Sequence, residues 1–240
     1  MMGKRGKDCM KHLAASLLTC LMLCCILASC GAPPEGEESS VPSGEALSLK
    51  AQEPGSDEAP QKEMRAVWIT YYEISMKAQN GGDESLFYQK VDEMFSRVQN
   101  AGFNTVIVQV RPYSDAFYPS RIFPWSAYLT GTQGKDPGYD PLAILVERAH
   151  AHGLFIHAWF NPYRVSYNPD FALLSKDNPA RKWKEDADKT NDGWLIVLEN
   201  GIYYNPAVPE VQRMIIDGVR EIVEQYEVDG VHMDLSLIHI

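Results

Sequence analysis

Apolar and polar positions follow two alternating periods along the chain from residue 64 onward. Short runs rich in β-branched and aromatic residues, typical of strands, are separated by stretches with an apolar residue every three or four positions, typical of helices. Strands are expected at residues 64–70, 105–110, 154–160 and 228–234. Helices are expected at residues 84–102, 140–153 and 208–226. Strands that alternate with helices predict a parallel sheet.

Each expected strand has one aliphatic face and one polar or aromatic face, because successive side chains point to opposite sides of a strand. In the strand at 105–110, Val106 and Val108 share one face, and Gln109 and Arg111 share the other. A doubly wound sheet needs two aliphatic faces. A β/α barrel has helices outside and lets inward residues at the carboxyl ends of its strands form a site. The pattern therefore predicts an α/β fold of the TIM-like (β/α) barrel type.

The expected barrel is incomplete. A full eight-unit barrel takes about 250 residues, and only about four βα units follow residue 64. Residues 64–240 are therefore interpreted as the N-terminal half of the barrel domain. Residues 235–240 start no clear helix, and our hypothesis is that they are foreign to the protein.

The first thirty residues have the features of a lipoprotein export signal. Basic residues precede an apolar run at 13–28, which is shorter than the roughly 20 residues that a membrane-spanning helix needs. The run ends in Leu27-Ala28-Ser29-Cys30, a lipobox pattern in which the cysteine is acylated. An ordinary buried helix is the alternative, but no polar face interrupts the run. We expect an extracytoplasmic protein of the cell envelope, held to a membrane by lipid on Cys30.

Composition separates a linker from the folded part. Residues 31–63 are rich in Gly, Pro, Ser and Glu, which predicts a disordered acidic linker. The formal net charge of −10 argues against a nucleic-acid partner, because phosphate binding needs basic patches. All five cysteines lie within the first thirty residues, so disulfides and Cys-ligated metals are not expected in the folded part. Nothing in the sequence points to an organic cofactor, and no metal-binding residue is predicted.

Polar and aromatic residues gather where the expected strands end. Flat aromatic rings stack on the C–H face of a sugar, and Arg, Asn and His side chains bond its hydroxyl groups, so a carbohydrate is the predicted ligand. Asp234 is the candidate catalytic residue, because a carboxylate in a cavity costs free energy unless it is paired or functional. The candidate substrate-binding residues are Trp68, Arg111, Asp115, Trp125, His157, Trp159, Asn161, Tyr163, Arg164, Asn205 and His232.

Purely structural roles are open alternatives for three pairs of these residues. Trp68 and Trp159 would fill the core. Arg111 and Asp115 would pair with each other. His157 and His232 would form hydrogen bonds within the barrel interior.

Eight stretches form an ordered set that spans nearly all of residues 64–234. They are Arg65–Ile69, Gln109–Pro112, Asp115–Tyr118, Pro124–Ser126, Tyr139–Leu142, His157–Arg164 together with Asn205-Pro206, and Val228–Asp234. As a set they resemble the glycosyl hydrolase-like 10 family of bacterial envelope lipoproteins. The resemblance implies a TIM-like barrel that acts on glycosidic bonds of an envelope or extracellular polysaccharide, with cell-wall glycan as an expected substrate.

The sequence departs from the family pattern directly after Asp234, where Leu235 stands in place of a second aspartate. Most glycosidases need two carboxylates, so we expect hydrolysis from a longer form of the protein and an inactive fragment here. One alternative is a non-catalytic glycan-binding envelope lipoprotein. A second is an envelope assembly factor that reuses the fold, since fold does not fix function.

Overall fold

The computed structural model describes residues 63–79 and 81–234, which belong to one compact unit. The expected export signal with Cys30, the linker up to residue 62 and the tail at 235–240 lie outside the described residues. None of the helices within the described ranges is both long enough and apolar enough to cross a membrane.

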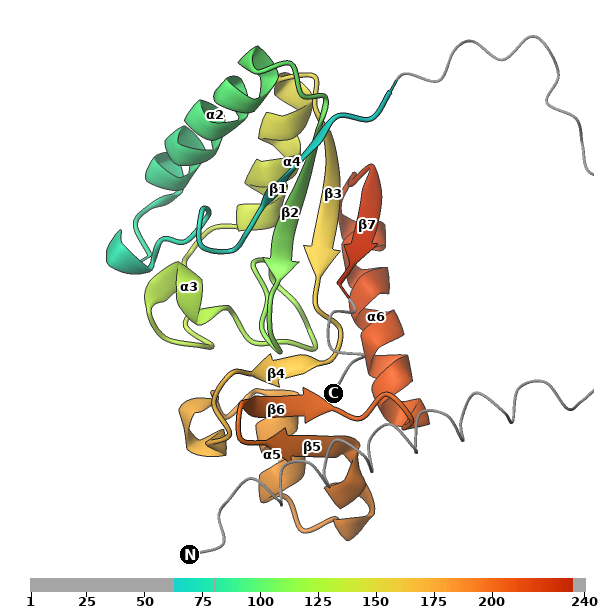
Figure 1. Cartoon of the computed structure of the whole chain (residues 1–240). Coiled ribbons are helices and arrows are strands. Elements are labelled where there is room, and N and C mark those ends of the chain that lie inside the picture. Colours follow the sequence, from blue (N-terminus) through green and yellow to red (C-terminus); the bar gives the residue numbers. More distant parts are fainter. Residues whose placement is uncertain (1–62, 80, 235–240) are drawn as a thin grey trace, which may run out of the picture. The chain divides into compact units, whose positions relative to one another are not determined.

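Four parallel strands form the main sheet, in the spatial order β1-β2-β3-β7 (Figure 1). Their bounds are Ala66–Ile69 for β1, Thr105–Arg111 for β2, Phe155–Phe160 for β3 and Gly230–Met233 for β7. Three of them lie within the segments expected from the alternation of apolar and polar residues, and β2 extends one residue beyond its expected segment. Neighbours in the chain are neighbours in the sheet, as in a barrel that winds in one direction.

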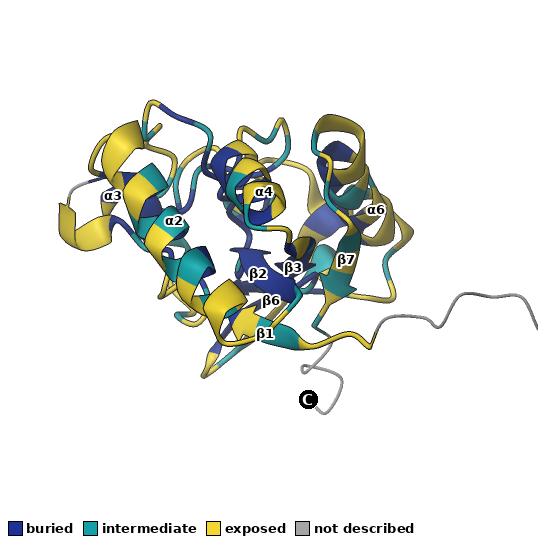
Figure 2. Cartoon of the chain, turned by 90° about the horizontal axis from the view of Figure 1, so that it is seen from above, coloured by how far each residue is buried: buried dark blue, intermediate teal, exposed yellow. Residues whose placement is uncertain are grey.

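Three long helices connect these strands and cover one face of the sheet (Figure 2). They are α2 at Glu84–Asn100, α4 at Pro141–Ala151 and α6 at Pro209–Gln225. Phe87 of α2 and Leu145 of α4 are fully buried in the same cluster as Val108 of β2. Because the helices lie on one face and the strands run in sequential parallel order, the fold class is confirmed as a partial TIM-like (β/α) barrel.

Two of the three long helices, α2 and α4, begin at residues whose side chains satisfy free backbone amides. The carboxylate of Asp83 accepts a hydrogen bond from the Leu86 amide at 2.8 Å. Asp140 accepts from the amides of Leu142 and Ala143 and is followed by a proline in the first turn. Aspartate at the N-cap and proline in the first turn are residues that favour a helix start.

A small antiparallel sheet lies at the carboxyl end of the main sheet (Figure 1) and was not expected from the sequence. Its order is β4-β6-β5, where β4 is Arg164–Ser166, β5 is Leu195–Leu198 and β6 is Gly201–Tyr204. The helix α5, Pro179–Glu185, falls between β4 and β5 along the chain. Short turns of helix lie at α3 Ala127–Thr130 and at the 3₁₀ segments Lys77–Gln79, Phe171–Leu173 and Lys189–Trp194.

The expectation that Arg111 shares the face of Gln109 is wrong, because β2 contains a bulge. Gln109 pairs with Trp159 and Arg111 pairs with Phe160, so β2 has one more residue than β3 at this point. The extra residue reverses the alternation. The guanidinium of Arg111 packs against the rings of Phe123 and Phe160, at 4.4 and 4.8 Å from their centroids.

Candidate functional site

A row of hydrogen-bonded side chains crosses the carboxyl ends of three neighbouring strands. The Gln109 amide nitrogen donates to Oδ1 of Asn161 at 2.6 Å, and Nδ2 of Asn161 donates to Oδ2 of Asp234 at 3.0 Å. The backbone amide of Asp234 donates to the carbonyl of Phe160 at 3.0 Å, which extends the pairing of β7 with β3. Gln109 and Asn161 are buried. The row therefore fixes the position of the Asp234 carboxylate at the edge where barrel sites form.

Aromatic rings cover the inner face of the sheet beside this row. Trp68 meets Trp159 edge to face with centroids 4.8 Å apart, and meets His232 in the same manner at 4.3 Å. Trp68 is half exposed, whereas Trp159 is buried. Nε1 of Trp159 is buried and has no hydrogen-bond partner among the described residues. An indole donor that lacks a partner can bond a ligand hydroxyl.

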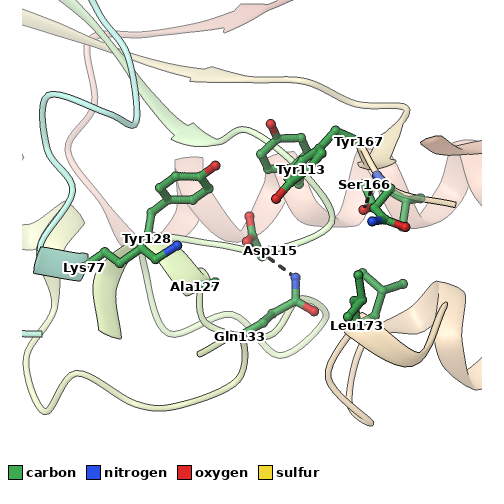
Figure 3. Close-up of a pocket in the computed structure, with 12 residues that line it drawn as sticks. Lys77, Tyr113, Asp115, Ala127, Tyr128, Gln133, Ser166, Tyr167 and Leu173 are labelled. Atoms are coloured by element: carbon green, nitrogen blue, oxygen red, sulfur yellow. Dashed lines mark hydrogen bonds between the residues drawn. The ribbon is translucent and has the colours of Figure 1, made fainter. Parts of the chain in front are cut away.

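A pocket of about 130 Å³ opens beside the row and contains a buried carboxyl group, that of Asp115 (Figure 3). Asp115 is 2% exposed, and Nε2 of Gln133 donates to its Oδ2 over a long 3.5 Å. Burial raises the pKa of Asp115 to about 6, although the Ser126 hydroxyl and the Gln133 amide oppose the shift. The carboxyl group therefore stays protonated to a higher pH than an exposed aspartate does.

Tyrosine side chains connect the pocket to the row. The hydroxyl groups of Tyr71 and Tyr113 lie 3.0 Å apart, and the Tyr71 ring also packs against Tyr128 at 4.4 Å between centroids. The backbone amide of Tyr71 donates to Oε1 of Gln109 at 3.5 Å. Burial and the phenol contacts raise the pKa of Tyr71, so it stays protonated. Hydrogen bonds through Tyr71 thus connect the pocket to the Asp234 row.

The structure brings together about half of the residues predicted for the site. Members of the row and its aromatic face are Asp234, Asn161, Trp68, Trp159 and His232. Asp115 lies in the adjoining pocket, and Arg164 begins β4 next to the pocket residue Val165.

The other predicted residues lie away from this group. Arg111 points into the core against Phe123 and Phe160 instead of the mouth. His157 lies lower on the sheet, beside Gly230 at the start of β7, because the strands are paired in that register. Trp125 lines a different surface pocket together with Pro124 and residues around Ser120.

Two further predicted residues serve the small sheet and its connection. Tyr163 packs against the cluster around Phe160, and its carbonyl accepts a hydrogen bond from the Tyr204 amide at 2.8 Å. The side chain of Asn205 donates to the Gly193 carbonyl at 2.9 Å and accepts from the Ala207 amide at 3.0 Å. Asn205 therefore stabilises the turn that leads into α6.

Sequence reasoning missed several residues of the site. Gln109 was placed on the inner face but not among the site residues, although a polar residue within an apolar strand is itself a signal. Tyr113, Tyr128 and Tyr167 were missed because they come from two connections, β2 to α4 and β3 to α6, whose approach depends on the tertiary fold. Within the described ranges, no group of three or more His, Cys, Asp or Glu side chains could hold a metal ion.

The sheet of parallel strands, with polar and aromatic residues at their carboxyl ends, places the protein in the class of (β/α) barrel proteins. Comparison with known families identifies the family within this class. Residues 63–238 match the model of the family Glycosyl hydrolase-like 10. The chain belongs to this family. The resemblance noted from the eight stretches of sequence is thereby confirmed.

Relatives with known names agree with this membership. The chain is 45% identical over 175 residues to the glycosyl hydrolase YngK of Bacillus subtilis (strain 168), a match that covers 72% of this chain and 33% of YngK. It is 32% identical over 227 residues to the glycosyl hydrolase DigH of Escherichia coli (strain K12), covering 88% of this chain and 49% of DigH. The chain therefore spans about a third to a half of the length of these relatives.

Solved structures with similar folds are more distant. The α-L-fucosidase isoenzyme 2 from Paenibacillus thiaminolyticus is 17% identical, with a TM-score of 0.46, over 72% of this chain and 23% of that chain. The maltogenic α-amylase AmyB from Thermotoga neapolitana is 14% identical, with a TM-score of 0.45, over 72% of this chain and 39% of that chain.

Proposed function

We propose that the protein is a glycoside hydrolase of the cell envelope, anchored by lipid on Cys30, that cleaves an envelope or extracellular polysaccharide such as cell-wall glycan. The observation that carries the proposal is the hydrogen bond from Asn161 to Asp234 at 3.0 Å, at the carboxyl edge of a barrel sheet. Membership of a glycosyl hydrolase-like family and the names of YngK and DigH support the reaction type.

In this proposal Asp234 acts as a general acid or base at the glycosidic bond, one of the two carboxylate roles in most glycosidases. Asn161 holds the carboxylate in place, and its own orientation is fixed by Gln109. The free indole donor of Trp159 bonds a sugar hydroxyl, and the half-exposed ring of Trp68 stacks on a sugar face.

The test is the release of reducing ends from purified polysaccharides by the complete protein. Cell-wall glycan strands, a neutral β-glucan and an α-glucan serve as substrates. We expect release from at least one of these polymers, with cell-wall glycan first among them. No release from any of them, by protein that binds them, would replace hydrolysis with the alternative of a non-catalytic glycan-binding lipoprotein.

The proposed lipid anchor on Cys30 is tested separately. Cells that express the protein are fed labelled palmitate, and the label is followed in the membrane fraction. We expect labelled protein in the membrane and no label on the Cys30→Ser variant. Label that persists in the variant would contradict anchoring through Cys30.

A further inference from the structure

The pocket that contains Asp115 has the position of a substrate subsite. Lys77 comes from the 3₁₀ turn after β1, Tyr113 from the loop after β2, and Tyr167 from the connection that leads from β3 to α6. All three connections leave the carboxyl ends of barrel strands, where barrel enzymes build their sites. The pocket is therefore part of the same face as Asp234 without sharing its residues.

Its walls are aromatic and its floor is polar. The Tyr113 ring lies 6.4 Å from the Tyr128 ring in a nearly parallel orientation, and 5.9 Å from the Tyr167 ring. Tyr167 is 68% exposed, so its large ring does not fill the core and is open to a ligand. Figure 3 shows these rings around the opening, with Asp115 and Gln133 beneath them. Such rings offer flat apolar surface beside hydroxyl groups.

One oxygen of the Asp115 carboxyl group lacks a well-formed hydrogen bond. Gln133 donates to Oδ2, whereas Oδ1 is buried and no described residue donates to it with ordinary hydrogen-bond geometry. A buried oxygen without a partner costs about 1–3 kcal/mol. A ligand hydroxyl that enters the pocket would remove this cost, so the site favours an occupant with donors.

The charge and the size of the pocket limit the kind of ligand that it can bind. Lys77 and Asp115 are the charged residues that line the pocket, and their formal charges cancel. A water molecule needs roughly 10–15 Å³ of such space, so 130 Å³ has room for about ten waters. That space suits one sugar ring.

We propose that this pocket is a subsite for one uncharged sugar residue of the glycan, with the Asp115 carboxyl bonding a ring hydroxyl and Tyr113, Tyr128 and Tyr167 packing on the ring. The inference rests on the proposed function for the identity of the polymer. It adds a second point of attachment beside the reacting bond, joined to the Asp234 row by Tyr71 and Gln109.

The test is direct binding of monosaccharides, followed by backbone amide shifts in NMR spectra. Glucose and N-acetylglucosamine are the uncharged probes, and glucuronic acid and glucosamine are the charged ones. We expect an uncharged probe to shift the amides of Tyr128, Gln133 and Tyr167. Binding of only a charged probe, or shifts confined to other parts of the protein, would overturn the proposal.

Two variants localise the binding. Tyr167→Ala removes an exposed ring whose loss costs the fold little, and we expect affinity to fall about tenfold. Asp115→Leu fills the floor with apolar atoms, and we expect no detectable binding. Phe103→Ala, an exposed ring at the opposite end of the sheet, is the matched control and should bind as the parent does. Equal affinity of Tyr167→Ala and the parent would overturn the subsite.

Failure of the subsite and failure of the proposed function give different results. Asp234→Asn should leave monosaccharide binding unchanged, because Asp234 does not line the pocket. If monosaccharides bind the pocket but the protein does not hydrolyse the glycan, the proposed function is contradicted and the subsite stands. If the protein hydrolyses the glycan but Tyr167→Ala does not raise the KM, the subsite is contradicted and the proposed function stands.

Discussion

The side-chain amide of Asn161 donates a hydrogen bond of 3.0 Å to the carboxylate of Asp234. The same amide group accepts from Gln109, so its orientation is fixed from the other side. Two residues from adjacent strands thus determine where a carboxylate stands at the carboxyl edge of the barrel sheet.

This relationship predicts the behaviour of Asn161→Asp. The substitution replaces a donor by a second carboxylate about 3 Å from Asp234, and two like charges at that distance cannot both ionise easily. We expect one carboxyl group of the pair to titrate at least one pH unit higher than Asp234 does in the parent. Carbon NMR of labelled aspartates measures this. Coincident titration curves in the two proteins would show that Asn161 does not contact Asp234.

Asp115 gives a prediction about stability and pH. Its pKa is raised from 3.8 to about 6 in the folded protein by burial. The folded state is therefore favoured below the unfolded value and loses that advantage as pH rises through about 6. We expect Asp115→Asn to become more stable relative to the parent between pH 4 and pH 7, by roughly 3 kcal/mol at most. Urea unfolding at each pH measures the difference, and a difference independent of pH would be the contrary result.

For Asp92 we predict the opposite dependence of stability on pH. Hydrogen bonds from His152 at 2.8 Å and from Arg148 lower the pKa of Asp92. A lowered pKa gives stability that is present above the ordinary value of 3.8 and is lost as pH falls through the folded value. We expect Asp92→Asn to cost about 1 kcal/mol at pH 6, since the pair is partly exposed, and little at pH 2. Thermal unfolding across this range tests it; a cost that grows on acidification would contradict the assignment.

Gly218 of α6 is required by the buried Arg111. A Cβ at Gly218 would clash with Nη1 of Arg111 and would lie 2.8 Å from the Phe123 ring. Arg111 is 1% exposed and held between two rings, so it has no room to move away. An alanine usually stabilises a helix by about 1 kcal/mol relative to glycine. Here we expect Gly218→Ala to destabilise the protein by about 1–3 kcal/mol.

The control for this variant is Asp217→Ala, one position earlier on the same helix. Asp217 is exposed and pairs with Arg220 on the surface, so we expect its loss to change the free energy of unfolding by less than about 0.5 kcal/mol. Denaturant unfolding of both variants gives the comparison. A stabilised Gly218→Ala protein would show that Arg111 does not occupy the space beside α6.

The four parallel strands and three long helices could be predicted because each carries its own periodic pattern. Valines alternate along β2, and α6 repeats apolar residues at helical spacing from Val211 to Ile222. The small sheet could also have been found. Asn200-Gly201 stands at the turn between the apolar run Leu195–Leu198 and the run Ile202–Tyr204, and this dipeptide is a strong hairpin signal.

The site was harder to predict than the fold. Asn161 and Asp234 follow directly from strand alternation, since each stands at the end of a strand on the polar face. Arg111 was misplaced because a bulge of one residue reverses the alternation, and no local sequence signal marked it. The tyrosine pocket depends on how three separate connections approach one another, which periodicity along one strand does not encode.

The most direct test of the account compares glycan turnover by the complete protein with turnover by its Asp234→Asn variant. Asp217→Asn is the matched control, because it makes the same chemical change on the exposed surface of α6. We predict at least a hundredfold loss of turnover for Asp234→Asn with glycan binding retained, and no change for Asp217→Asn. Turnover by Asp234→Asn equal to that of the parent would contradict the assignment of Asp234 as the catalytic residue.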